Sequence, residues 1–193
     1  MIVTPPPVEG AEGHVADVYG RDLATDGFVY SHTQVMAINP DAHEAFEALV
    51  KAIVPSIGVR TYELATLAAA RAIGSPHCLL AHGRKTLRAE AMDEGQLERA
   101  ARDYTDADLS EADVAVMRFA ERLSTDAASM TDADAQALRN AGFTDRQIVD
   151  IALSAGIRNY YSRVLQALAV PVEDVPGLSP ALTEALLSPL EGR

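Results

Sequence analysis

Residues 58–88 read GVRTYELATLAAARAIGSPHCLLAHGRKTLR and predict two helices joined by a sharp turn. Gly74 suits a left-handed stop at the end of the first helix. Ser75 is a natural N-cap for the second helix, and Pro76 is a favoured first helical residue. The spacing of leucine and alanine before Gly74 is typical of a largely buried helix. The stretch therefore predicts a buried helix, a stop and a new helix.

The one cysteine of the chain, Cys78, lies in the first turn of this second helix. Free backbone N–H groups and the positive end of the helix dipole favour a thiolate there. His82 follows one turn later on the same face, where its imidazole can take the thiol proton directly or through one water. Glu63 lies in the preceding helix, and a buried carboxylate needs a partner such as histidine. With His77 and Ser75, these residues form the candidate catalytic site.

Two other interpretations of the cysteine stay open. Cysteine is among the residue types most often buried, so Cys78 can be inert packing. In the second interpretation, Cys78 binds zinc together with its neighbouring histidines and Glu63. Adjacent Cys and His on one helix point about 100° apart, however, and the sequence lacks the separated ligand pairs usual for zinc. We therefore expect no metal and no cofactor.

The site resembles the signature of the alkylhydroperoxidase D and carboxymuconolactone decarboxylase superfamily, in which a Glu precedes Cys-x-x-Cys-x-x-x-His at this interval. The matching positions are Glu63, Ser75, His77, Cys78, Ala81 and His82. Ser75 replaces the first cysteine, as in members described as peroxidase-related that carry Ser-x-x-Cys-x-x-Ala-His. The resemblance is close over residues 58–88 and loose elsewhere. It implies an all-α fold that assembles as a homo-oligomer: a dimer, trimer or hexamer.

The resemblance also implies a function, a thiol-dependent hydroperoxidase of the peroxiredoxin type. Cys78 matches the residue that attacks the peroxide, with His82 as its base and Glu63 orienting and charging His82. His77 is expected to tune the site, and Ser75 to cap the helix and donate a hydrogen bond. Ser75 matches the residue that closes a disulfide in two-cysteine members, which a hydroxyl cannot do. An external thiol or a neighbouring subunit must then reduce oxidised Cys78.

Two alternatives to the peroxidase remain. One is a lyase or isomerase like carboxymuconolactone decarboxylase, with His82 and Glu63 carrying protons. The other is a non-enzymatic redox sensor, in which oxidation of Cys78 changes assembly. For the favoured function the expected partners are a small hydroperoxide, an external thiol reductant and further copies of the chain.

Capping residues and apolar spacing predict helices through most of the chain, and no useful period-two alternation predicts a strand. Residues 1–10 are expected to be extended, and the stretch from 24 to the N-cap Asn39 irregular. Thr144 and Gln147 form a capping box for a long helix. The expected helices cover about 12–23, 40–54, 62–73, 76–88, a short stretch from 93, 110–127, 131–142, 144–170 and 180–187.

An internal repeat with a shift of 84 residues relates 58–88 to 142–172 within a single domain, 1–193. Gly58 falls on Gly142 and Ile73 on Ile157, so the apolar pattern survives. The reactive positions change, because Cys78 falls on Ser162. The sequence thus predicts two related helical units, one of which keeps the ionisable residues.

Composition narrows the function classes. With 193 residues and 48% hydrophobic residues, the chain has the size and apolar content of one ordinary domain. Its net charge of −12 argues against nucleic-acid binding, which needs clustered lysine and arginine. No run approaches a membrane span, and the start lacks the pattern of a signal peptide. No membrane partner and a cytoplasmic location are therefore expected.

Overall fold

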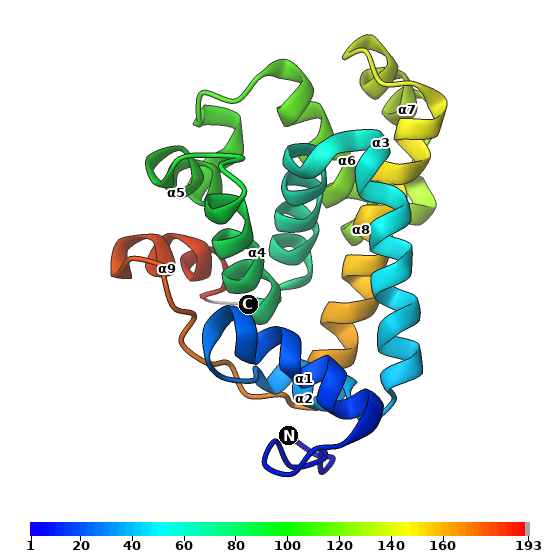
Figure 1. Ribbon diagram of the computed structural model, residues 1–193. Coiled ribbons are helices and arrows are strands. Elements are labelled where there is room, and N and C mark those ends of the chain that lie inside the picture. The colour runs from blue at the N-terminus through cyan, green and yellow to red at the C-terminus, as the bar shows by residue number, and fades with distance from the viewer. Residues whose placement is uncertain (192–193) are drawn as a thin grey trace.

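The computed structural model describes residues 1–191, in which all regular structure is helical (Figure 1). This confirms the expected all-α fold class. No helix in that part of the chain is both long and apolar enough to cross a bilayer. The α-helices are α1 (Gly13–Asp26), α2 (Ser31–Met36), α3 (Pro40–Ile73), α4 (Pro76–Arg88), α5 (Glu94–Asp103), α6 (Glu111–Asp126), α7 (Asp132–Asn140), α8 (Asp145–Ala167) and α9 (Pro180–Leu187). Short 3-10 turns lie at Tyr104–Asp106, Ala127–Ser129 and Ser188–Leu190.

Several expected helix boundaries are confirmed. The side chain of Asn39 accepts a hydrogen bond from the Ala42 N–H at 3.1 Å and caps α3. Gly74 ends α3 in the left-handed conformation, with φ of 74°. The capping box at Thr144 starts α8. These local signals succeed because each satisfies backbone groups that the helix itself leaves unpaired.

The structure differs from the sequence-based expectation in several segments, and α1 runs on to Asp26 rather than ending at residue 23. Ser31–Met36 forms α2 where an irregular stretch was expected, because six residues are too few to show a period. Helix α3 continues through residues 55–61 and bends at Gly58, where φ is 78° and ψ is 160°. Helix α8 ends at Ala167 rather than Val170, since Ala169 turns to a positive φ of 48°.

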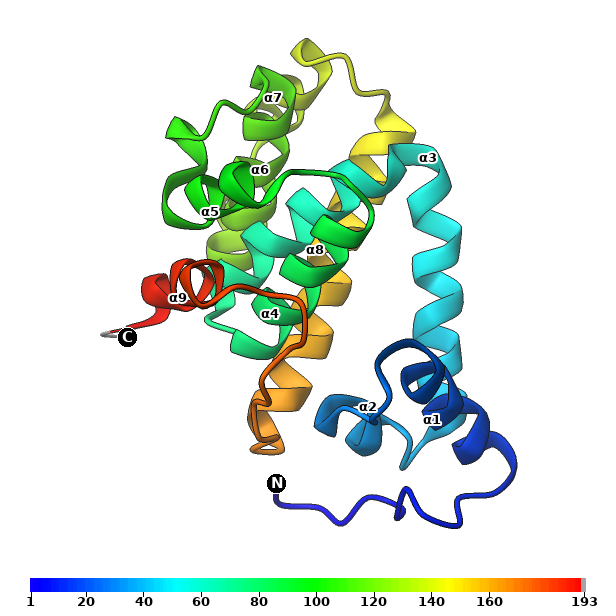
Figure 2. The same cartoon turned by 60° about the vertical axis from the view of Figure 1, so that its left-hand side comes forward.

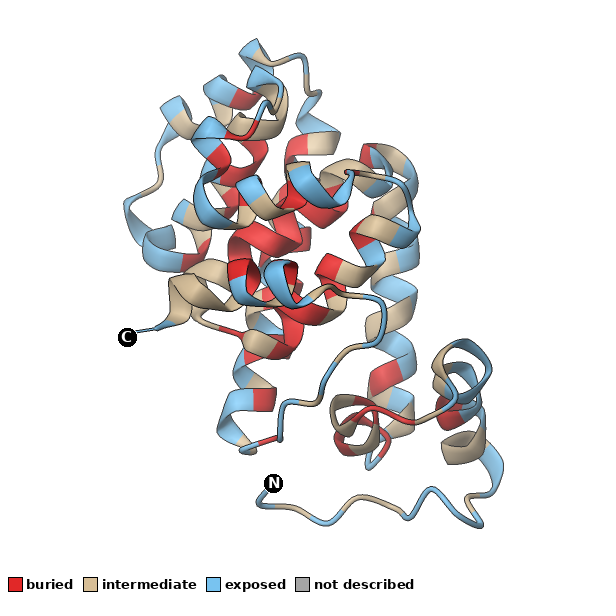
Figure 3. Cartoon of the chain, turned by 90° about the vertical axis from the view of Figure 1, so that its left-hand side faces the viewer, coloured by how far each residue is buried: buried red, intermediate tan, exposed pale blue. Residues whose placement is uncertain are grey.

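The core lies between α3, α8 and α6, and α4 packs against α3 from the other side (Figures 1 and 2). Buried residues gather in the middle of the molecule, around the second half of α3 (Figure 3). Leu64, Ile151 and Leu165 are fully buried there. Burying one such side chain contributes about 1.5–3 kcal/mol. The turn from α3 to α4, which carries the site, is thus anchored in the best-packed part of the fold.

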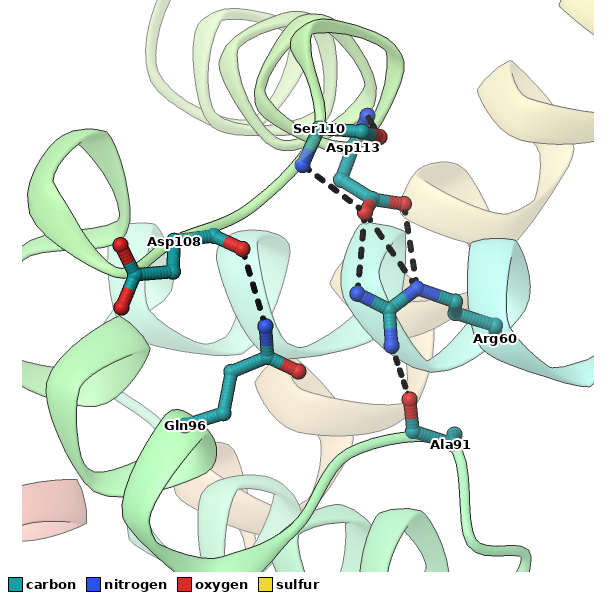
Figure 4. A network of polar contacts seen from close by, with 6 residues as sticks. All are labelled: Arg60, Ala91, Gln96, Asp108, Ser110 and Asp113. Atoms are coloured by element: carbon teal, nitrogen blue, oxygen red, sulfur yellow. Dashed lines mark hydrogen bonds and ion pairs between the residues drawn. The ribbon is translucent and has the colours of Figure 1, made fainter.

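The bend in α3 is held from outside by Arg60. Its guanidinium donates to the Asp113 carboxylate at the start of α6, at 2.9–3.3 Å, and to the carbonyl of Ala91 (Figure 4). Asp113 also accepts from the Ser110 backbone N–H, which completes the α6 capping box. This network fixes the direction in which the second half of α3 leaves Gly58.

Helices α1 and α2 form a small separate layer at the foot of the first half of α3 (Figure 2). Val18, Tyr19, Val29 and Ala37 make its own apolar cluster. Ion pairing of Arg84 with Asp26 joins this layer to α4. The layer covers one side of the site described next.

Candidate functional site

The Cys78 sulfur is buried at the start of α4, where the residue is only 2% exposed. Among residues 1–191 its two hydrogen-bond donors both come from α8: Ser162 Oγ at 3.1 Å and Arg158 Nη1 at 3.4 Å. Burial opposes ionisation of the thiol, but the positive charge of Arg158 and these hydrogen bonds outweigh it and lower the pKa of Cys78. The site therefore favours a thiolate.

Arg158 is the main site residue that the sequence analysis missed. Its guanidinium is buried, and it also donates to the Tyr62 hydroxyl at 3.4 Å. Within residues 1–191 no carboxylate forms an ion pair with it. A buried cation is costly unless an anion lies beside it. The Cys78 sulfur is the group in contact that can carry that negative charge.

His82 and Glu63 are brought together as expected. The His82 Nδ1–H donates to Glu63 Oε2 at 2.7 Å, and both side chains are almost fully buried. Thr86 Oγ1 donates to the His82 carbonyl, and the Tyr62 ring meets the imidazole edge-on. With Nδ1 bound to Glu63, His82 has Nε2 left to accept a proton.

Burial sets the charge of this pair. It raises the pKa of Glu63 to about 7, although Lys85 and Arg158 oppose the shift. It also lowers the pKa of His82 well below its usual value, with help from the same two cations. The imidazole is therefore held neutral at neutral pH. This corrects the expectation that Glu63 charges His82: Glu63 orients a neutral base.

His82 does not hydrogen-bond to Cys78, whose donors are the α8 residues described above. The two side chains nevertheless line one cavity from the same face of α4. A molecule bound between them can touch both the sulfur and Nε2. The geometry thus fits transfer of a proton to a bound substrate or through a water.

His77 lines the cavity beside Cys78, and Ser75 lies at the start of α4. The His77 Nε2–H donates to the Pro171 carbonyl at 2.9 Å, which leaves its buried Nδ1 without a hydrogen bond. Ser75 occupies the N-cap position of α4, but its hydroxyl makes no cap hydrogen bond. The expected capping role of the Ser75 side chain is therefore wrong. Its hydroxyl lies close enough to Cys78 to help lower the thiol pKa.

A cavity of about 470 Å³ opens onto the sulfur. Helix α4 supplies its reactive wall, the first half of α3 and α8 supply apolar and aromatic walls, and the α1–α2 layer covers one side. Its aromatic lining comes from Phe46, Tyr62 and Tyr161. A cavity of this size can enclose a small organic molecule.

The predicted repeat has one counterpart at this site. Ser162, the position that the 84-residue shift matches to Cys78, donates its hydroxyl proton to that sulfur. Gly58 and Gly142, also matched by the shift, both have positive φ. The duplication itself stays a prediction.

Fold and site together define an all-helical protein with one buried cysteine at a cavity. Residues 40–122 match the model of the carboxymuconolactone decarboxylase family. No curated protein matches the chain significantly. This stretch of the chain is therefore similar to that family, and the structural neighbours described next are similar in fold.

Three solved structures are similar in fold. A peroxidase-related protein from Ralstonia eutropha JMP134, described as an alkylhydroperoxidase core, is 24% identical, with 90% of this chain and 92% of that chain covered and a TM-score of 0.78. A peroxidase-related protein from Silicibacter sp. TM1040 is 23% identical, with coverages of 88% and 90% and a TM-score of 0.77. An alanine-for-cysteine variant of the debrominase Bmp8, bound to 2,3,4-tribromopyrrole, is 22% identical, with coverages of 99% and 98% and a TM-score of 0.76.

Proposed function

We propose that this protein is a thiol-dependent hydroperoxidase in which Cys78 is the one reactive cysteine. The observation that carries the proposal is the contact between Cys78 and Arg158, because a buried guanidinium without a carboxylate partner stabilises a thiolate. The cavity gives a small organic hydroperoxide access to that sulfur. The names of two structural neighbours, both called peroxidase-related, point to the same chemistry.

In the proposed reaction the Cys78 sulfur attacks the terminal oxygen of the hydroperoxide. The O–O bond breaks, the sulfur becomes a sulfenic acid, and an alkoxide leaves. The alkoxide takes a proton that neutral His82 relays from solvent through Nε2, and it departs as an alcohol. The sulfur is oxidised by two electrons and the peroxide is reduced by two.

The second half of the cycle needs an external thiol. Cys78 is the one cysteine of the chain, so no internal disulfide can form. A first thiol displaces the hydroxyl of the sulfenic acid as water and forms a mixed disulfide. A second thiol then attacks that disulfide, releases Cys78 and leaves as the oxidised reductant.

A lyase or isomerase is the second candidate, because the His82–Glu63 pair is complete without the sulfur. Such an enzyme moves protons on a carbon acid and does not need Cys78. The dehalogenating neighbour also shows that this fold hosts activities besides peroxidase. A Cys78→Ser variant separates the two functions, because the hydroperoxidase needs the sulfur and the lyase or isomerase does not.

The direct experiment is steady-state reduction of tert-butyl hydroperoxide with dithiothreitol as the reductant. We expect turnover by the unmodified protein and none above background by Cys78→Ser. His82→Ala should retain helicity but turn over roughly 10² to 10⁴ times more slowly, the usual range for loss of a general base. One oxidation per molecule without turnover indicates a redox sensor, and no oxidation of Cys78 refutes the proposal.

A further inference from the structure

Lys85 is a cation of the cavity that acts on the charge of Glu63 and His82 but takes no part in the steps of the proposed reaction. It lies on α4 and lines the cavity beside Cys78 and His82. The residue is exposed, so its ammonium group can meet a ligand that enters. In the described chain it makes no hydrogen bond and no ion pair.

The register of α4 aims Lys85 at the reactive wall. Residues 78, 82 and 85 are four and three apart, so their side chains lie on one face of the helix. Cys78 and Lys85 are separated by two turns, about 10 Å between their Cα atoms. Because the lysine side chain is long and flexible, its ammonium can come closer to the sulfur than the two Cα atoms are to each other. A ligand that touches both groups can therefore be shorter than this Cα separation.

The charged groups nearest the sulfur have partners. Glu63 accepts from His82, and Arg158 donates to the Cys78 sulfur. Asp22, across the cavity, accepts from the Tyr30 backbone N–H at 3.2 Å and forms no ion pair with Lys85. An anion that enters the cavity therefore meets a Lys85 ammonium that no carboxylate of the described residues holds in an ion pair.

Arg158 gives a second, independent indication of an anionic ligand. The residue is 3% exposed, and its Nε is buried without a hydrogen-bond partner. Arg158 Nε and the Lys85 ammonium are thus two donors at the reactive end of the cavity for which the described residues supply no hydrogen-bond acceptor. The aromatic rings of Phe46 and Tyr161 line the space between, and a flat apolar body fits against such walls.

We propose that Lys85 is an anion site that selects substrates carrying a carboxylate about one benzene ring away from the atom that Cys78 attacks. The substrate class is thus a small aromatic or similarly compact hydroperoxide acid rather than a neutral alkyl hydroperoxide. The inference rests on the proposed function for the identity of the reacting group. The binding of the carboxylate does not depend on it.

The test uses alkylation of Cys78 by two reagents that differ only in charge, 4-(bromomethyl)benzoate and 4-(bromomethyl)benzamide. Each rate is divided by the rate of the same reagent with free cysteine, and labelling of Cys78 is located by peptide mass. In the unmodified protein we expect the acid to be favoured by about tenfold, the effect of one ion pair in a partly shielded site. A ratio of rates cancels any change in the thiolate fraction.

Three variants sharpen the result. Lys85→Met keeps the length of the side chain and should reduce the preference to near unity, whereas Lys85→Arg should retain it. Lys51→Met is the matched control, because Lys51 also lines the cavity but from α3. The ratio of alkylation rates with iodoacetate and iodoacetamide should not depend on Lys85. The carboxylate of iodoacetate lies next to the reacting carbon and so cannot reach the ammonium while that carbon meets the sulfur.

Three results would overturn the anion site. The preference for the acid reagent could persist in Lys85→Met, it could be lost equally in Lys51→Met, or it could be missing from the unmodified protein. A different result would refute the proposed hydroperoxidase function. If Cys78 reacts with neither reagent, the proposed function fails, and calorimetric titration with 4-methylbenzoate and 4-methylbenzamide still decides the anion site. Binding of the benzoate alone, weakened at least tenfold in Lys85→Met, supports the site, and equal binding of the two refutes it.

Discussion

Cys78 and Arg158 depend on each other for their charge. Each is buried, and each would be expensive to bury charged without the other. The contact of 3.4 Å between sulfur and Nη1 lets the two charges compensate. The reactivity of the thiol is therefore a property of the pair, set by a residue 80 positions away in the sequence.

Replacing Arg158 should raise the pKa of Cys78. Arg158→Met removes the positive charge beside the sulfur, so the thiol should titrate at least about one unit higher. The measurement is the rate of iodoacetamide alkylation as a function of pH. Arg158→Lys keeps the charge and should show a smaller rise, and helicity by circular dichroism checks the fold of both. An unchanged titration in Arg158→Met contradicts the thiolate assignment.

Glu63 should make stability depend on pH. Its pKa is about 7 in the folded protein and 4.5 in the unfolded chain. Between these values the unfolded chain releases a proton that the folded protein keeps, so rising pH lowers stability through this window. Glu63→Gln lacks this loss. Its free energy of unfolding relative to the parent should therefore rise by on the order of 2 to 3 kcal/mol from pH 4.5 to 7.5.

Urea unfolding of the two proteins at several pH values checks this prediction. His82 is present in both, so the difference between the curves isolates Glu63. If the free energies of unfolding of the two proteins change in parallel from pH 4.5 to 7.5, the pKa of Glu63 is the same in the folded and unfolded protein. That result contradicts the assignment of Glu63 as a buried carboxyl group that orients His82.

Part of the site could be predicted from the sequence and part could not. The spacing of Cys78 and His82 on one helix is local, and Glu63 precedes them by a recognisable interval, so these three residues can be predicted from the sequence. Arg158 comes from α8, and no local rule connects it to Cys78. A signal did exist: Arg158 shares a helix face with the buried Ile151 and Leu165, seven residues away on either side.

At the scale of elements, the bend in α3 decides where the site lies. Gly58 adopts φ of 78° and ψ of 160°, a region open essentially to glycine alone. The bend directs the second half of α3, which carries Glu63, into the core. The first half of α3 then lines one side of the cavity. The apolar spacing predicts two helices here, because it does not show that a chain stays helical on both sides of a bend.

Gly58→Ala should destabilise the protein by about 1–3 kcal/mol, because alanine is strained in this conformation. Gly156→Ala is the matched control, since Gly156 lies within α8, is exposed and has open space around an added Cβ. That change should be neutral or stabilise by up to about 1 kcal/mol. Thermal unfolding of both variants gives the comparison, and equal effects at the two glycines contradict the account of the bend.

At the scale of the whole molecule, α8 has an outer face without cover in the single chain. Val149, Leu153 and Tyr160 are 57%, 39% and 47% exposed, and their spacing of four and seven residues forms one stripe. Exposed apolar stripes of this kind mark contacts between proteins. The homo-oligomer expected from the sequence is therefore a proposal for which this stripe is the natural interface.

Leu153→Glu should dissociate the oligomer, because a charge in the middle of an apolar contact is costly to bury. Light scattering after size-exclusion chromatography gives the molar mass of both proteins. Val172→Glu is the control, since Val172 is a similarly exposed apolar residue in the segment between α8 and α9. A parent protein that elutes as a monomer, or a Leu153→Glu variant with unchanged mass, contradicts the interface.

The central claim is that Cys78 is oxidised by a hydroperoxide to a sulfenic acid that the chain cannot resolve itself. The most direct measurement is the intact mass of the protein after one equivalent of cumene hydroperoxide, with and without dimedone as a sulfenate trap. We predict one dimedone adduct per chain, located on Cys78 and missing from Cys78→Ser. Without the trap, intermolecular disulfide or over-oxidised Cys78 should accumulate. Unchanged mass and a full thiol count after treatment would show that Cys78 is inert packing.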